Sequence, residues 1–186
     1  MTHFPLRITC GSLVALLASS LVAQAEMHLT SGAFTNGGPL AAAQVFNGFG
    51  CDGGNLSPEL AWDGVPAGTQ SLGVTVYDPD APTGSGWWHW TLFNIPATAT
   101  GLTAGAGSGR ADLPAGAIQG RTDFGAPGYG GACPPPGAAP HHYIFTLYAL
   151  KEARLPLDET ASGAMVGFML RANMIEQATL TATYGR

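Results

Sequence analysis

The sequence has few basic residues and no basic cluster. Its 186 residues include seven Lys and Arg against twelve Asp and Glu, which gives a formal net charge of −5. Proteins that bind nucleic acids through the phosphate backbone gather Lys and Arg on one face, and polybasic membrane-binding segments do the same. The composition therefore argues against nucleic acid and against an anionic membrane surface as partners.

Charged residues of either sign are scarce. They make up 10% of the chain, whereas apolar residues make up 46%. Disordered chains and coiled coils are much richer in charge. The 27 Gly and 14 Pro mark frequent turns. With no internal repeat and no linker, these features predict one mostly β domain with long, shaped loops.

An apolar run lies near the N-terminus, at Gly11–Val22, and is too short to span a bilayer. Ala23-Gln24-Ala25 follows it with the small-x-small pattern of a signal peptidase site. We therefore expect a signal peptide at 1–25 and a single domain at 26–186, with an uncleaved anchor as the alternative. The expected protein is periplasmic or secreted, without an integral membrane segment after cleavage.

Cysteine is rare, with three in the chain. Cys10 lies within the predicted signal peptide, which leaves Cys51 and Cys133. An even number of cysteines in an oxidising compartment favours a disulfide, so we expect these two to pair. Two unpaired buried thiols are the alternative.

Alternating apolar residues predict four main strands and two shorter ones. In the strongest of these strands, the period of two puts His141 and Tyr143 on one face and His142 on the other. The first of the main strands is expected to be half-buried. The six are Leu72–Tyr77, His89–Ile95, His142–Leu150 and Ala178–Tyr184, with the shorter His28–Thr30 and Gln44–Phe46.

One main helix is predicted near the C-terminus, over about Thr160–Asn173. Met165, Phe168, Met169 and Ala172 recur at i, i+3, i+4 and i+7, as on the buried face of an amphipathic helix. We expect this stripe to pack against the core rather than to hold a cofactor.

Three stretches rich in glycine or proline are predicted as loops: Gly50–Pro58, Thr98–Leu113 and Gly125–Pro140. The first contains Asp and Asn but lacks the spacing of a calcium-binding loop, so we interpret it as a plain turn. In the third, glycines allow close backbone approach, prolines stiffen the chain and Cys133 can anchor it. Long loops in compact domains are commonly functional, so this loop is predicted to form a binding wall.

Residues able to carry chemistry gather at predicted strand ends and at the end of the third loop. An Asp, two histidines and a Tyr from such positions favour a real site over isolated structural residues. Imidazole N–H, phenol O–H and backbone N–H groups are all donors, which suits a small anion, and Asp78 can accept from a histidine and fix its tautomer. No Arg is in the cluster, so binding should be modest. The candidates are Asp78, Asp80, His89, His141, His142 and Tyr143.

Other chemistries fit less well. Two histidines and an Asp could hold a metal ion, but no zinc-type H-x-x-x-H or C-x-x-C spacing occurs. A hydrolase stays open, with Asp78 orienting His89 or His141 as general base on water, although no G-x-S-x-G elbow is present. A protein inhibitor that docks a protease through the pocket loops is a third hypothesis. We expect no metal, no other cofactor and no enzymatic activity.

Five motifs together are similar to a known family. They are Asn55-Leu56-Ser57-Pro58 with Trp62, Asp78-Pro79-Asp80-Ala81-Pro82, Trp88-His89-Trp90, Gly130-Gly131-Ala132-Cys133-Pro134-Pro135 and His141-His142-Tyr143. Over nearly all of the chain after residue 25, the sequence resembles the phosphatidylethanolamine-binding protein family, in its bacterial Raf-kinase-inhibitor-like branch. The resemblance implies an antiparallel β-sandwich with few helices and one anion pocket, which in that family binds phosphate-like groups and phospholipid head groups.

Carried over position by position, the resemblance implies roles for eight residues. It favours an exported protein that binds a small anion or a phosphorylated head group, and an exposed aromatic surface would allow a homodimer. Ligand-binding roles fall on Asp78 and His89 at one side, on His141 and Tyr143 at the other, and on Gly131 and Pro134 in the loop wall, while Asp80 and Pro82 are expected to support the loop.

Overall fold

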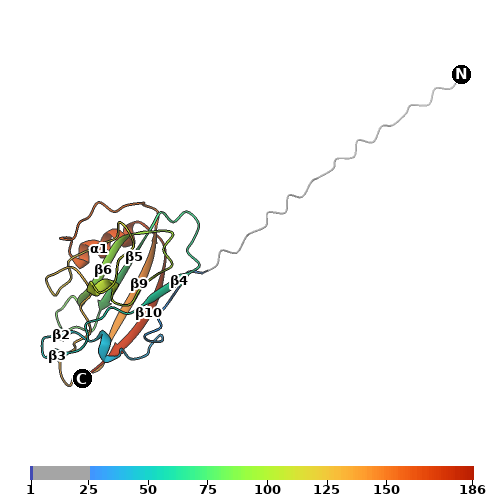
Figure 1. Cartoon of the computed structure of the whole chain (residues 1–186). Helices are drawn as coiled ribbons and strands as arrows, with labels where there is room; N and C mark the ends of the chain where they lie inside the picture. The colour runs from blue at the N-terminus through green and yellow to red at the C-terminus, as the bar shows by residue number, and fades with distance from the viewer. Residues whose placement is uncertain (2–25) are drawn as a thin grey trace.

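The computed structural model describes Met1 and residues 26–186, and Figure 1 shows long strands with helix α1 lying beside them. The predicted signal peptide at 1–25 lies, apart from Met1, outside the described residues. In the described part of the chain, no helix is long and apolar enough to cross a membrane.

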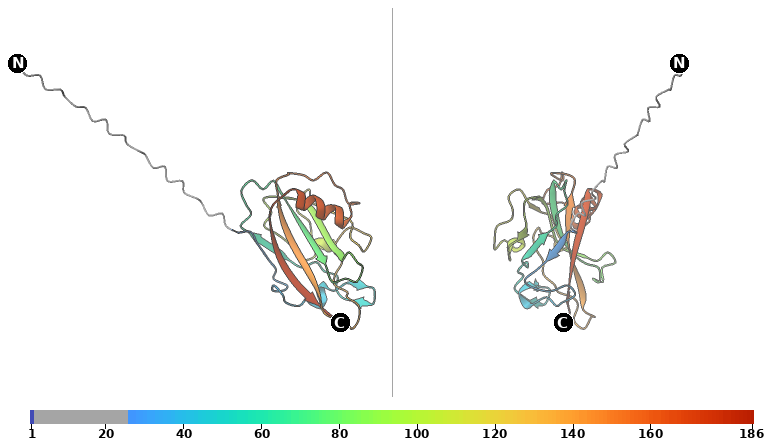
Figure 2. Two further views of the ribbon diagram at one scale, coloured as in Figure 1. Left: turned by 180° about the vertical axis from the view of Figure 1, so that it is seen from behind. Right: turned by 90° about the vertical axis from the view of Figure 1, so that its right-hand side faces the viewer.

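A five-stranded antiparallel sheet forms the centre of the fold. β9 and β10 pair along almost their whole length, and both views of Figure 2 show them side by side. Within the described residues, the predicted mostly β fold with one main α-helix is confirmed. In spatial order the strands are β10 (Met174–Tyr184), β9 (His141–Leu150), β5 (Ser71–Asp78), β6 (Trp87–Pro96) and β8 (Ile118–Gln119).

Two smaller sheets and two 3-10 turns accompany the large sheet. The first small sheet packs against one face of the large sheet, and the second is a short ribbon whose connecting turn reaches the site described below. The first consists of β1 (His28–Thr30), β4 (Leu60–Asp63) and β7 (Gly101–Leu102), the ribbon of β2 (Asn47–Gly48) and β3 (Cys51–Asp52), and the 3-10 turns are η1 (Ala42–Gln44) and η2 (Ala106–Ser108).

Apolar residues cover both faces of the large sheet. On one face, Leu72, Val74 and Val76 of β5 belong to the core between the two larger sheets. On the other, Val166 and Leu170 belong to a second cluster under helix α1 (Gly163–Ala172). β5 is therefore buried on both faces, rather than half-buried as its alternation predicts.

The buried face of α1 differs from the prediction. Met165 and Phe168 are 49% and 66% exposed, and of the four predicted residues only the half-buried Met169 packs against the core. The buried positions keep the helical period but begin two residues earlier, at Gly163, Val166, Gly167 and Leu170. The prediction was wrong because it took the largest apolar side chains for the buried face.

Trp88 explains why glycines occupy that face. A Cβ added at Gly163 would lie 2.3 Å from the Trp88 side chain, and one added at Gly167 would lie 2.6 Å from it. Only residues without a side chain let the helix approach the indole this closely. The helix begins at Gly163 rather than Thr160, because the Ser162 side chain accepts a hydrogen bond from the Met165 N–H and caps it.

Several boundaries also differ. Residues 42–44 form a 3-10 turn, and Val45 joins Ala132 by one isolated bridge, so Gln44–Phe46 is not a strand. β10 starts at Met174 instead of Ala178, since its first residues pair with the end of β9. The predicted loop at Thr98–Leu113 contains the short strand β7 and a 3-10 turn.

Candidate functional site

Asp78 is the last residue of β5 and is buried, with 2% of its surface exposed. Its Oδ1 accepts hydrogen bonds from the backbone N–H groups of Asp80, at 2.8 Å, and Ala81, at 3.1 Å. A carboxylate that accepts from the backbone two and three residues on closes the chain into a turn. The same side chain thus ends the strand, shapes the following loop and leaves Oδ2 free for other partners.

The sheet register brings β9 to this carboxylate. Tyr77 pairs with Ile144, so the first residues of β9 lie beside the end of β5. His141 and Tyr143 are buried and His142 is exposed, as the period of two predicts. The His141 Nδ1–H donates to Asp78 Oδ2 at 2.7 Å. The predicted contact between an Asp and a histidine therefore exists, with His141 as the histidine.

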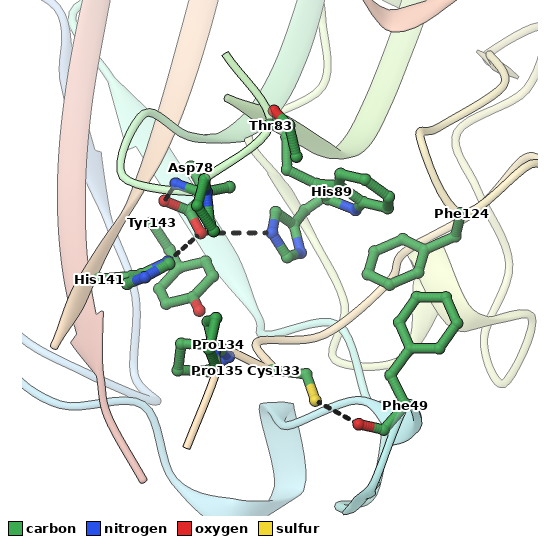
Figure 3. A pocket seen from close by; sticks show the side chains of 13 residues that line it. Phe49, Asp78, Thr83, His89, Phe124, Cys133, Pro134, Pro135, His141 and Tyr143 are labelled. Carbon is green, nitrogen blue, oxygen red and sulfur yellow. Dashed lines mark hydrogen bonds and ion pairs between the residues drawn. The ribbon is translucent and has the colours of Figure 1, made fainter. Parts of the chain in front are cut away.

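His89 reaches the same carboxylate from β6. Its Nδ1 lies 2.8 Å from the carbonyl oxygen of Gly130. A carbonyl oxygen only accepts, so Nδ1 carries the proton and Nε2 is the second ring nitrogen. Nε2 lies 4.0 Å from Asp78 Oδ2, and Figure 3 shows the ring directed toward that carboxylate.

Burial sets the protonation of His89. It lowers the pKa of the imidazole below the ordinary value of 6.5, although the Gly130 carbonyl and the charge of Asp78 act in the opposite direction. Near neutral pH the ring is therefore neutral, with a proton on Nδ1 and a lone pair on Nε2.

Tyr143 and Trp87 each carry a buried donor at the same place. The Tyr143 hydroxyl and the Trp87 Nε1–H have no hydrogen-bond partner among the described residues. Burial, with a smaller contribution from the Asp78 charge, raises the pKa of the Tyr143 phenol against the opposing effect of the Cys133 backbone, so it keeps its proton. Because an unpaired buried polar group costs about 1–3 kcal/mol, two of them beside one cavity point to a ligand or to water.

These groups surround a pocket of about 160 Å³. An apolar cavity of roughly 150 Å³ holds a six-carbon ring, so a five-atom tetrahedral anion has room here. No Lys or Arg lines the pocket, whose wall is largely aromatic and proline. The lining residues are Phe49, Asp78, Ala81, Pro82, Thr83, Trp87, His89, Phe124, Cys133, Pro134, Pro135, His141 and Tyr143.

Five of the six residues predicted to bind ligand line this pocket, and Gly131 does not. The Gly131 N–H donates to Asn55 Oδ1 at 2.8 Å, and a Cβ added there would lie 2.2 Å from the Gln44 carbonyl oxygen. Gly131 thus allows two backbone segments to approach behind the wall. The prediction carried this role over from the family resemblance, but the close contacts of Gly131 are with backbone outside the pocket.

The two residues predicted to support the loop have different places. Asp80 lies outside the pocket, where its Oδ2 accepts from both the backbone N–H and the Nδ1–H of His142, each at 2.7 Å. Burial opposes a shift, but these hydrogen bonds lower the pKa of Asp80 below 3.8. They join the loop to β9 on the exposed side of the strand. Pro82 lines the pocket itself.

Sequence reasoning predicted aromatic walls but missed two of their residues, Phe124 and Phe49. Phe124 packs edge-on against His89 with ring centroids 5.3 Å apart, and also against Trp87 at 5.4 Å. Phe49 lies 5.8 Å from Phe124, is 69% exposed and has a positive φ of 53°. A bulky residue in that conformation is uncommon. The place of Trp87 could be predicted, since it lies two residues before His89 on the same strand face. The two phenylalanines lie in loops, where the sequence shows no periodic pattern.

A disulfide holds the side of the pocket opposite Asp78. Cys51 and Cys133 are bonded, with Cα atoms 6.0 Å apart, so the predicted pairing is confirmed. The Cys133 sulfur lies 3.7 Å from the Phe49 carbonyl oxygen, a contact without a shared proton because a disulfide sulfur carries none. Arg186 adds a second link, since its guanidinium donates to the carbonyl oxygens of Pro134, at 2.6 Å, and Gly50, at 2.7 Å.

The sequence predicts no metal site, with two histidines and an Asp as the alternative. Within the part of the chain that the structure describes, no group of three or more His, Cys, Asp or Glu side chains is arranged to hold a metal ion. The arrangement offers instead hydrogen-bond donors, a carboxylate and aromatic faces around a small cavity.

Comparison with known proteins assigns this chain to a family. The phosphatidylethanolamine-binding protein family model matches residues 30–185. YbcL of Escherichia coli is 58% identical over 163 residues, which cover 86% of this chain and 88% of YbcL. YbhB of the same organism is 54% identical over 158 residues, which cover 85% of this chain and 99% of YbhB.

Solved structures agree with the sequence comparison. The crystal structure of YbcL, described as a new member of the mammalian PEBP family, has a TM-score of 0.84 at 57% identity and covers 87% of this chain and 99% of its own. CT736 of Chlamydia trachomatis, described as a homologue of phosphatidylethanolamine-binding protein, has a TM-score of 0.73 at 32% identity, over 87% of this chain and 98% of its own. Neither the family nor these relatives is named for a catalytic activity. This chain belongs to the phosphatidylethanolamine-binding protein family.

Proposed function

We propose that this chain is an exported protein that binds small oxyanions, above all the phosphate of a phosphorylated head group, in the pocket around Asp78. The observation that carries the proposal is the Tyr143 hydroxyl, a buried donor beside a cavity of about 160 Å³ and without a partner among the described residues. A phosphate oxygen is an acceptor that would complete it.

The other groups at the pocket agree with such a ligand. The Trp87 indole N–H supplies a second unpaired donor, and the imidazoles of His89 and His141 border the same cavity beside Asp78. Without Lys or Arg in the lining, no bidentate clamp on phosphate can form, so we expect affinities in the high micromolar to millimolar range. The name of the family model, which refers to phosphatidylethanolamine, fits a head group as the source of the anion.

Export is part of the proposal. The apolar run and small-x-small pattern in residues 1–25 have the form of a signal peptide. A disulfide between Cys51 and Cys133 persists in oxidising compartments and is rare in the cytosol. Together they favour the periplasm or the exterior of the cell.

Imidazole NMR tests the binding directly. Titration with phosphoethanolamine should shift the ring resonances of His89 and His141, with a common midpoint in the millimolar range or below. His28, which lies outside the pocket lining in β1, serves as the internal control and should not respond. If the His89 and His141 signals stay unchanged at tens of millimolar ligand, the proposed function is wrong.

A further inference from the structure

The charges at the pocket oppose the anion proposed above. Its lining contains one carboxylate, Asp78, and no Lys or Arg. Asp78 accepts three hydrogen bonds, from two backbone N–H groups and from His141, which is how an ionised carboxylate is held in a protein. A second carboxylate, Asp123, also acts on His89 through its charge, and its Oδ2 accepts from the Trp88 N–H. A fully ionised anion would enter a site where the fixed charges are negative.

The tautomer of His89 adds to this conflict. Its Nδ1–H is committed to the Gly130 carbonyl, so the neutral ring presents a lone pair at Nε2. Nε2 also lies 4.0 Å from Asp78 Oδ2. An oxyanion oxygen that met this lone pair would be repelled, whereas one proton between the two atoms would turn the same contact into a hydrogen bond.

The remaining groups cannot supply that proton. Tyr143 offers its own O–H as a donor and keeps it, because it is buried beside a carboxylate. His141 donates its Nδ1–H to Asp78, so Nε2 is its one ring nitrogen left to contact a ligand. Trp87 is a donor that does not titrate. None of the groups that face His89 from β5, β6, β9 and the loop before β9 can protonate its Nε2. The proton must therefore come from solution or from the ligand.

We propose that the pocket takes up an oxyanion together with one proton, held between His89 Nε2 and a ligand oxygen, and therefore selects phosphomonoesters over sulfate esters of the same shape. The proposal rests on the proposed function and names the ligand class more narrowly. The proton count of the complex is the same whether the ligand arrives as the monoanion or the imidazole is protonated first, and no covalent bond changes.

A matched pair of ligands separates this idea from simple anion binding. Phosphoethanolamine and ethanolamine sulfate share one skeleton and one tetrahedral group. A phosphomonoester has a second pKa near 6, so it can carry a proton, whereas a sulfate ester is the base of a strong acid and carries none near neutral pH. Phosphoethanolamine should therefore bind more tightly, by an order of magnitude or more.

Calorimetry in two buffers of different ionisation enthalpy measures the proton. At about pH 8 both ligands should bind with uptake of one proton, and the affinity for each should fall about tenfold per pH unit. At about pH 5, below the second pKa of the phosphomonoester, its uptake should approach zero while that of the sulfate ester stays close to one as long as the His89 ring is neutral in the free protein.

The seat of the proton is tested by His89→Gln, whose amide cannot titrate. Uptake on binding ethanolamine sulfate should vanish, and the slope of affinity against pH should flatten. His142→Gln is the control, since that imidazole is adjacent in the chain to His141 but lies outside the pocket, and it should leave both quantities unchanged. If His89→Gln does not fold, a shift of the His89 Nε2 resonance to the protonated range in the complex of the natural chain gives the same information.

The outcomes are distinct. Binding of both ligands with equal affinity and no proton uptake would overturn this inference and leave the proposed function standing. Proton uptake that persists in His89→Gln would overturn the assignment to His89. Failure of both ligands to bind at tens of millimolar would overturn the inference and the proposed function together.

Discussion

The carboxylate of Asp78 and the imidazole of His141 meet at 2.7 Å across 63 positions of sequence. Local structure does not bring these two residues together. β5 and β9 are neighbours in the large sheet, and their register puts the end of one beside the start of the other. The contact therefore couples the formation of the site to the formation of the sheet.

Asp78→Asn should destabilise the fold. The amide can still accept from the turn backbone through Oδ1, but its NH₂ group would face the Nδ1–H of His141, so a hydrogen bond to a charged group is lost. Such bonds contribute about 1.5–3 kcal/mol, and we expect a loss of that size in the free energy of unfolding by urea. Asp80→Asn is the control: it disrupts an exposed pair with His142, and its cost should stay below about 1 kcal/mol. Equal costs for the two variants would contradict this account.

Tyr143→Phe should separate stability from binding. Its hydroxyl has no partner among the described residues, so its removal takes away an unsatisfied polar group and should leave the free energy of unfolding unchanged or slightly higher. The affinity for phosphoethanolamine should fall about 2- to 13-fold, the equivalent of one hydrogen bond of 0.5–1.5 kcal/mol. Tyr148→Phe, in the second apolar cluster on the opposite face of β9, should not change the affinity. A Tyr143→Phe variant that binds normally would show that the phenol does not meet the ligand.

Gly167→Ala should be destabilising, against the usual effect of this change in a helix. Alanine normally stabilises a helix by about 0.5–1 kcal/mol relative to glycine. Here the added methyl group would lie 2.6 Å from the Trp88 ring, so we expect overpacking to cost about 1–3 kcal/mol in chemical denaturation. Phe168→Ala, at an exposed position of the same helix, should cost less than about 1 kcal/mol. Stabilisation by Gly167→Ala would mean that the helix packs less tightly on Trp88 than described.

Helix α1 also shows which features of the structure could be predicted from the sequence. The period of its buried face follows from the sequence, but the choice of face does not, because glycine carries no hydrophobic signal and Trp88 is 75 or more positions away. Asp78, His89, His141 and Tyr143 were predictable because alternation fixes their faces and they lie near strand ends. Phe49 and Phe124 were not, since they lie in loops whose path depends on tertiary contacts such as the disulfide.

Stability should depend on pH through His89. Burial lowers the pKa of His89 in the folded state, so below the ordinary value of about 6.5 the unfolded chain binds more protons than the folded chain. The free energy of unfolding should therefore be constant above that pH and fall as the pH drops toward the folded pKa, by up to about 1.4 kcal/mol per unit. His89→Gln should reduce this slope by up to about 1.4 kcal/mol per pH unit, which corresponds to one proton. His142→Gln should leave the slope unchanged. Denaturation curves over this pH window measure it, and stability that rises on acidification would have the wrong sign.

Loss of the disulfide should cost several kcal/mol. The two cysteines are 82 positions apart, and the chain-entropy model gives about 4.5 kcal/mol for a loop of that length, within a usual range of about 2–5. The double variant Cys51→Ala/Cys133→Ala should lose stability in this range when unfolded by urea, and a reducing agent should affect the natural chain but not the variant. A loss below about 1 kcal/mol would indicate that the crosslink does not constrain the unfolded chain.

The same crosslink separates the formation of the two halves of the pocket. The Asp78–His141 half of the pocket comes from paired strands and can form as soon as the sheet does. The facing half, at residues 133–135, is held by the Cys51–Cys133 disulfide and by the hydrogen bond from Arg186 to the Pro134 carbonyl oxygen, so a reduced chain lacks one of these two links. A newly synthesised chain that is still reduced would therefore hold ligand poorly, and capture would follow the arrival of the protein where disulfides form.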